Sequence, residues 1–196
     1  MTDVGEAPPT DASSDEAANA AANEAVIGPT HAPSSPTAVV VMGPSGAGKS
    51  TLGEALATAW GARFVDADAH HPPSNVAKMR RGEALDEADR APWLARLSTL
   101  LDAEPGRVVL ACSALRREHR KALGVDGIQR RLVFLEVEPA TLARRLEERR
   151  GHFAGRALLD SQLATLEVPT SEERVLHLNG EVPLDQLVST TLAWLA

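Results

Sequence analysis

The chain has 196 residues, of which 43% are hydrophobic and 24% are charged, a balance typical of a soluble globular protein with one sizeable core. With 20 basic and 27 acidic residues, no Tyr, three Phe and three Trp, it lacks the basic surface and the stacking side chains of a typical nucleic-acid-binding protein. A single cysteine, Cys112, excludes an intramolecular disulfide and a multi-cysteine zinc site, and favours a reducing compartment, with the cytoplasm as the default.

The first 37 residues differ in composition from the rest. They contain six acidic residues and no Lys or Arg, and are rich in Ala, Pro, Ser and Thr. Such a segment buries too little apolar surface to offset the entropy lost on ordering, so we expect a disordered acidic tail over residues 1–37. It has neither a signal-peptide nor a transit-peptide pattern, and no apolar run of the chain is long enough to span a membrane. We expect the folded domain to cover residues 38–196.

Within that domain, short apolar runs alternate with stretches of helical spacing. Strands are predicted over residues 38–42, 63–65, 107–111, 131–137 and 175–178. Helices are predicted over residues 52–60, 92–101, 116–123, 141–149, 157–166 and 184–195. This alternation indicates an α/β fold, a parallel sheet covered by helices on both faces, with ligands at the carboxyl ends of the strands.

Directly after the first predicted strand, the sequence fits the phosphate-loop pattern G-x-x-x-x-G-K-[ST]. Glycines let the backbone N–H groups surround phosphate oxygens, and the following helix directs its positive end at the same anion. Lys49 supplies charge for the terminal phosphates, and the Ser50 hydroxyl is the expected Mg²⁺ ligand. The residues expected to bind nucleotide are Gly43, Pro44, Ser45, Gly46, Ala47, Gly48, Lys49, Ser50 and Thr51.

Two carboxylates follow the second predicted strand. Asp66 and Asp68 stand at i and i+2, so both point to the same side of an extended chain at the sheet edge that faces the phosphates. One carboxylate there can hold Mg²⁺ through water, and the other can orient or deprotonate an acceptor hydroxyl. The alternative is a pair of solvated loop carboxylates.

The third predicted strand argues against a motor ATPase or a signalling GTPase. It runs into Cys112-Ser113-Ala114 instead of the aspartate that would serve the magnesium shell, and the chain has no Asn-Lys-x-Asp segment for reading guanine. Cys112 at the end of a buried strand is most simply a small packing residue.

Further strings follow the phosphate loop in a fixed order. They are Asp66-Ala-Asp68 with His71-Pro72, residues 75–82, residues 85–94, residues 112–117 with Arg120, residues 145–153, and residues 161–167 with Pro169. The chain resembles the gluconate kinases in these strings, over residues 39–178. The run Asp89-Arg90-Ala-Pro92-Trp93-Leu94 is especially specific to that family.

The resemblance implies an adenylate-kinase-like phosphate-loop fold with a central five-stranded parallel sheet and a mobile lid. The reaction it implies is transfer of the γ-phosphoryl group of ATP, with Mg²⁺, to the 6-hydroxyl of D-gluconate, a small-molecule sugar acid. It suggests a homodimer. By position in the family pattern, Asp66 is expected to help Ser50 hold Mg²⁺, and Asp68 is expected to bind the acceptor or to act as base.

The acceptor needs a cation for its carboxylate and hydrogen-bonding groups for its hydroxyls. The cations available are Arg80, Arg81, Arg90, Arg116 and Arg120. The resemblance gives as substrate-binding residues Asp68, His71, Arg81, Ser113 and Arg120. It gives as catalytic residues Lys49, Asp68, Arg120 and Arg149.

Residues 145–156 resemble the lid that closes over ATP and excludes water. Arg145 and Arg149 lie four apart, hence on one helix face, where they can reach the nucleotide and its transferring phosphate. The alternative is a charged helix surface paired with Glu147 and Glu148. His70 beside His71 has no third metal ligand nearby, so we interpret the pair as hydrogen-bonding loop residues.

Two other functions stay open at this point. One is a shikimate or nucleoside-monophosphate kinase of the same fold, although the scarcity of aromatic side chains disfavours the nucleotide version. The other is a nucleotide-dependent switch or binding module.

Overall fold

The computed structural model describes Met1 and residues 36–125, 127, 129–148 and 154–196. The predicted tail, residues 1–37, lies almost entirely outside the described residues, so both the tail and the domain boundary stay predictions. The first strand begins at Ala38, where the folded domain was expected to start.

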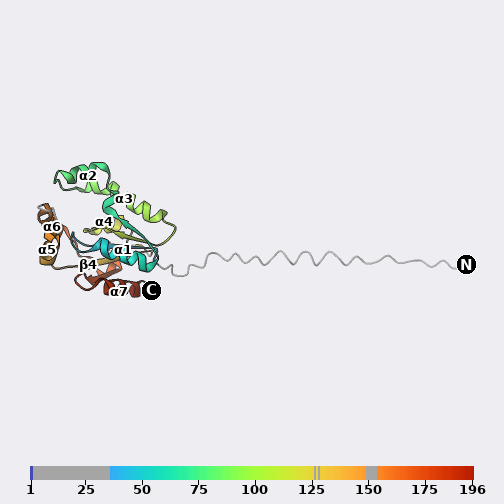
Figure 1. The fold of residues 1–196 in the computed structure, drawn as a ribbon. Coiled ribbons are helices and arrows are strands. Elements are labelled where there is room, and N and C mark those ends of the chain that lie inside the picture. The colour runs from blue at the N-terminus through green and yellow to red at the C-terminus, as the bar shows by residue number, and fades with distance from the viewer. Residues whose placement is uncertain (2–35, 126, 128, 149–153) are drawn as a thin grey trace. The chain divides into compact units, whose positions relative to one another are not determined.

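Five parallel strands form one sheet in the order β2-β3-β1-β4-β5. Figure 1 shows the helices arranged around this sheet. The strands are β1 Ala38–Met42, β2 Arg63–Asp66, β3 Val108–Ala111, β4 Arg130–Glu136 and β5 Val175–Asn179. The central strand β1 pairs Val40 with Leu110 on one side and with Leu132 on the other. The predicted five-stranded parallel sheet is confirmed.

Helices connect the strands. They are α1 Lys49–Trp60, α2 Pro73–Arg80, α3 Glu87–Ala103, α4 Arg117–Ala122, α5 Pro139–Glu148, α6 Ala154–Thr165 and α7 Leu184–Leu195, with 3₁₀ turns η1 Ala67–His70 and η2 Ser171–Glu173. Over the part of the chain that the structure describes, no helix combines the length and the apolar character needed to cross a membrane.

Side chains on β1 alternate between two cores, one on each face of the sheet. Val39 and Val41 pack with leucines of α1, α5, α6 and α7, whereas Val40 and Met42 pack with the buried face of α3 and the turn after α4. Successive residues of a strand point to opposite faces, so an all-apolar strand serves both cores at once. The prediction of helices on both faces is confirmed.

Helices α1, α5 and α6 begin two or three residues before their predicted starts, and two helical features differ more. Helix α2 was not predicted, and α3 begins at Glu87 instead of at Pro92. A capping box starts α3: the Asp86 side chain accepts from the Asp89 N–H at 2.9 Å, and the Asp89 side chain accepts from the Asp86 N–H at 2.9 Å. This cap satisfies the first orphan donors and sets the helix start upstream of Pro92.

The Leu97 side chain should account for a large share of the stability of the α3 core, because it is 0% exposed within that cluster. We expect Leu97→Ala to lower the free energy of unfolding by about 2–5 kcal/mol, measured by urea denaturation. In the control Leu158→Ala, where Leu158 is 52% exposed, the change should stay within about 0.5 kcal/mol. Equal losses in the two variants would contradict this assignment of the core.

Candidate active site

The phosphate loop joins β1 to α1 at the carboxyl edge of the sheet. Gly46 and Gly48 have φ of 87° and 98°, a region that side chains other than glycine rarely adopt. A Cβ on Gly46 would also come within 3.2 Å of the Leu142 carbonyl oxygen in α5. The loop therefore needs glycine here, and α1 begins directly after it at Lys49 with its amides facing an anion site.

Lys49, Ser50 and Asp66 lie together at this loop. The Lys49 ammonium donates to the Pro44 carbonyl oxygen at 3.0 Å. The Ser50 hydroxyl donates to Asp66 Oδ2 at 3.2 Å, and Asp66 Oδ1 accepts from the Asp68 N–H at 3.0 Å. The structure thus brings together the two oxygen groups that were expected to share a cation.

Asp68 lies in the 3₁₀ turn η1, and its side chain is exposed to solvent. Its side chain is 83% exposed, with Oδ1 3.9 Å from Nε2 of His71. The His71 ring is buried and stacks on Trp93 at a centroid distance of 4.0 Å. Burial lowers the pKa of His71, the Asp68 charge opposes this shift, and the Arg90 charge adds to it. The His71 imidazole is therefore neutral at pH 7, although a carboxylate lies beside it.

Arg90 belongs to a second charged cluster, centred on Glu87 at the start of α3. Glu87 Oε1 accepts from Arg90 Nη1 at 3.1 Å and lies 3.5 Å from Arg116 Nη1, and Glu87 Oε2 lies 2.9 Å from His119 Nε2. Burial alone would raise the pKa of the Glu87 carboxyl, but His119 and the two arginines outweigh it and lower that pKa. The cluster joins the loop after β3 to α3.

The end of β3 contacts the phosphate loop. The Ser113 carbonyl oxygen accepts from the Gly43 N–H at 3.4 Å. Burial raises the pKa of the neighbouring Cys112 thiol to about 12, and the nearby charges of Asp68 and Asp66 add to the shift. Cys112 is therefore a protonated packing residue and not a nucleophile.

Two predicted acceptor residues lie in unexpected surroundings. Arg120 is 1% exposed and donates from Nε and Nη2 to Glu173 at 2.6 and 2.9 Å. Its Nη1 donates to the carbonyl oxygens of Ala114, Leu115 and Glu167. These contacts give Arg120 a structural role at the Glu173 ion pair, and the substrate contact expected of it stays a prediction. Arg81 lies at the surface, paired with Glu83 at 2.6 Å.

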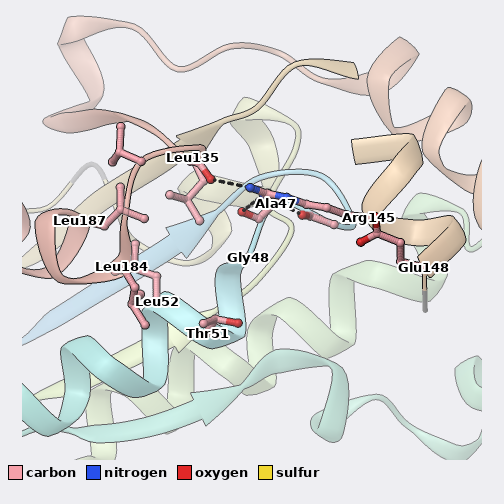
Figure 2. A pocket seen from close by; sticks show the side chains of 12 residues that line it. Ala47, Gly48, Thr51, Leu52, Leu135, Arg145, Glu148, Leu184 and Leu187 are labelled. Carbon is pink, nitrogen blue, oxygen red and sulfur yellow. Dashed lines mark hydrogen bonds between the residues drawn. The ribbon is translucent and has the colours of Figure 1, made fainter. Parts of the chain in front are cut away.

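A cavity of about 390 Å³ opens beside the phosphate loop, lined by Gly46, Gly48, Thr51, Arg145, Gly180 and Leu184 among others (Figure 2). Arg145 reaches across it from α5 and donates to the carbonyl oxygens of Gly46, Ala47 and Gly180 at 3.4, 3.5 and 3.0 Å. Arg149 and residues 150–153 of the predicted lid fall outside the described residues.

Sequence reasoning missed the contribution of the turn after β5 to this cavity. Gly180 and Leu184 line it, and a Cβ on Gly180 would meet Val137 Cγ2 at 2.6 Å. The signal that could have found the turn is its position, because β5 ends at the same sheet edge as the phosphate loop.

Comparisons with known proteins agree with this geometry. The family model of shikimate kinase matches residues 45–179. A gluconokinase from Gluconobacter oxydans (strain 621H) is 46% identical over 160 residues, covering 78% of this chain and 90% of that protein. The crystal structure of a gluconokinase from Sinorhizobium meliloti 1021 is 43% identical, with a TM-score of 0.74, and covers 82% of this chain and 92% of that one.

A more distant structure supports the fold alone. The APS kinase of Mycobacterium tuberculosis is 24% identical, with a TM-score of 0.61, over 82% of this chain and 97% of that one. The fold is therefore that of the adenylate-kinase-like phosphate-loop kinases, as the sequence predicted.

Removing Arg120 should destabilise the protein, because Glu173 would be left buried without its partner. We expect Arg120→Met to lower the free energy of unfolding by about 3–5 kcal/mol, measured by urea denaturation. In the exposed pair Arg117–Glu172, Arg117→Met should cost less than about 1 kcal/mol. Full stability of Arg120→Met together with loss of turnover would contradict the structural role and support the predicted catalytic contact.

Proposed function

The chain belongs to the gluconokinase family, and we propose that it transfers the γ-phosphoryl group of ATP to the 6-hydroxyl of D-gluconate. The observation that carries this proposal is one shared sheet edge. The phosphate loop lies there beside Asp66, while Asp68, His71 and Arg90 follow from the adjoining segments. A nucleotide and a sugar acid can meet at this edge.

The nucleotide would lie along the phosphate loop. Lys49 and the loop amides would bind the phosphates, and the neighbouring cavity with Arg145 and Gly180 would take the nucleoside. Binding of this kind fixes the terminal phosphoryl group in line for attack, which is the main contribution of the protein in phosphoryl transfer.

Mg²⁺ fits the oxygen pair formed by Ser50 and Asp66. Mg²⁺ is bound by one or two protein oxygens and completes its shell with water and substrate phosphates. Among the described residues no group of three His, Cys, Asp or Glu could hold a metal by itself, consistent with a cation shared with the nucleotide. When bound, the cation would neutralise charge that develops on the phosphates.

The acceptor would lie between Asp68 and the Glu87 cluster. Arg90 and Arg116 share Glu87 as a partner and can also donate to the gluconate carboxylate. Asp68, exposed at the other end, would accept the proton of the 6-hydroxyl as its oxygen attacks the γ-phosphorus and the bond to the bridging oxygen of ADP breaks. His71, neutral and packed on Trp93, would hold the segment that presents Asp68.

A carboxylate-bearing ring alcohol such as shikimate is the second candidate acceptor, because the shikimate kinase model matches most of the domain. The cytoplasmic location and the homodimer stay predictions from the sequence. The catalytic role expected of Arg149 stays a prediction for the same reaction.

A substrate panel tests the proposed function. We expect ADP release with ATP and Mg²⁺ to require D-gluconate, with little turnover on other aldonates, shikimate, AMP or CMP. The product should be 6-phospho-D-gluconate by mass and NMR. Turnover only on shikimate or on the nucleotides would refute the gluconate assignment.

The charge of Lys49 can be tested by mutation. Lys49→Ala should lower kcat by about 10²–10³-fold, since it removes charge stabilisation of the transferring group.

The position of the carboxylate can be tested separately. We expect Arg90→Met to raise KM for gluconate by about 10–100-fold, the value of a charged hydrogen bond, with KM for ATP unchanged. Arg96→Met, also on α3 but exposed, serves as the control and should change neither constant. An increase in KM for gluconate in Arg81→Met and none in Arg90→Met would transfer the role to Arg81.

A further inference from the structure

One peptide group of the phosphate loop is held from both sides. The Ser45 N–H donates to Gln162 Oε1 at 2.8 Å, from a helix 117 residues further along the chain. The carbonyl oxygen of the same peptide, which belongs to Pro44, accepts from the Lys49 ammonium at 3.0 Å. The two contacts are linked, because a planar trans peptide points its N–H and C=O in opposite directions.

Packing of α6 fixes where Gln162 can reach. Leu159 is 2% exposed, and Leu163 packs against the same core cluster, which also contains Leu52 and Leu56 of α1. Gln162 stands three residues after Leu159 and next to Leu163, so it shares the inward face of α6. Packing of Leu159 and Leu163 therefore holds this part of α6 against the core, so the Gln162 amide is kept next to the loop.

The neighbouring helix holds two further peptides of the loop, Gly46–Ala47 and Ala47–Gly48. Arg145 from α5 donates to the carbonyl oxygens of Gly46 and Ala47. Together the two helices therefore contact three successive loop residues, Gln162 through an N–H and Arg145 through two carbonyls. None of these contacts involves a side chain of the loop itself, so each acts on the orientation of its backbone.

We infer that Gln162 is a positioning residue for Lys49: by accepting from the Ser45 N–H, it sets the Pro44–Ser45 peptide so that its carbonyl oxygen faces the Lys49 ammonium. The Pro44 carbonyl oxygen also accepts from the Ala47 N–H at 3.2 Å. Loss of the Gln162 contact therefore removes the one restraint on the N–H side of this peptide that these contacts supply, and weakens the alignment of its carbonyl oxygen with the Lys49 ammonium. The structural part stands on these contacts alone, and the effect on phosphoryl transfer rests on the proposed function.

Hydrogen exchange of the Ser45 amide, followed by NMR in the full chain, tests the contact itself. In Gln162→Met, which keeps the length of the side chain but loses the acceptor, we expect exchange to accelerate at least tenfold, consistent with a lost hydrogen bond of about 1 kcal/mol or more. Gln162→Glu keeps an oxygen acceptor and should retain protection. The exposed Gln186→Met on α7 is the matched control and should change nothing.

Folding of each variant is checked in the same spectra, since the buried amides of α1 should keep their exchange rates. Gln162→Asn, one methylene shorter, serves as a second loss variant and should behave like Gln162→Met. Unchanged exchange of the Ser45 amide in both loss variants would overturn the inference.

A double-mutant cycle tests whether Gln162 acts through Lys49. ATP affinity is measured by calorimetry, which needs no acceptor. Gln162→Met should weaken ATP binding about three- to tenfold when Lys49 is present, and by less than about twofold in a Lys49→Ala background. The same factor in both backgrounds would overturn the inference. If gluconate proves inactive in the substrate panel while the cycle shows coupling, the proposed function fails and this inference stands.

Discussion

The close approach of the phosphate loop to its neighbours is the constraint on which the rest of the site depends. A Cβ at Gly43 would lie 3.1 Å from the Leu135 carbonyl oxygen, and one at Gly46 would lie 3.2 Å from that of Leu142. Because the loop lacks side chains at these points, β4 and α5 can pack against its backbone. Arg145 and Gln162 can then reach loop peptides directly, which ties the orientation of the phosphate-binding groups to helices remote in sequence.

The strands and helices predicted correctly are those that form because of a pattern among neighbouring residues. An all-apolar run predicts a buried strand, and the phosphate loop with α1 follows from the glycine spacing and the Lys-Ser pair. Helix α2 was missed because it has little apolar periodicity: it is held by the buried Asn75, whose side chain donates to the Asp89 carbonyl oxygen at 3.0 Å. That contact joins residues 14 apart, beyond the reach of a periodicity argument.

The candidate site likewise contains residues that the sequence could pair and residues that only the folded structure tells apart. Ser50 and Asp66 could be paired from the sequence because both follow strands that end at one edge of the sheet. Arg120 could not be separated from Arg90 in that way, since both are arginines near the acceptor strings. What separates them is the carboxylate each one meets: Glu173, 53 residues beyond Arg120, takes it into the interior, whereas Glu87 keeps Arg90 near the surface.

The two ion-pair clusters differ in how far their hydrogen-bond donors are occupied. Arg120 makes five hydrogen bonds, two to Glu173 and three to backbone carbonyl oxygens, within a nearly closed interior. At Glu87 the donor groups outnumber the acceptor groups. One carboxylate, which is 47% exposed, faces two guanidinium groups and an imidazole. Donors of Arg90 and Arg116 therefore remain for a second carboxylate. In the proposed reaction a sugar acid could bind at the Glu87 cluster without uncovering a buried charge, whereas at Arg120 it would have to compete with the buried Glu173 carboxylate.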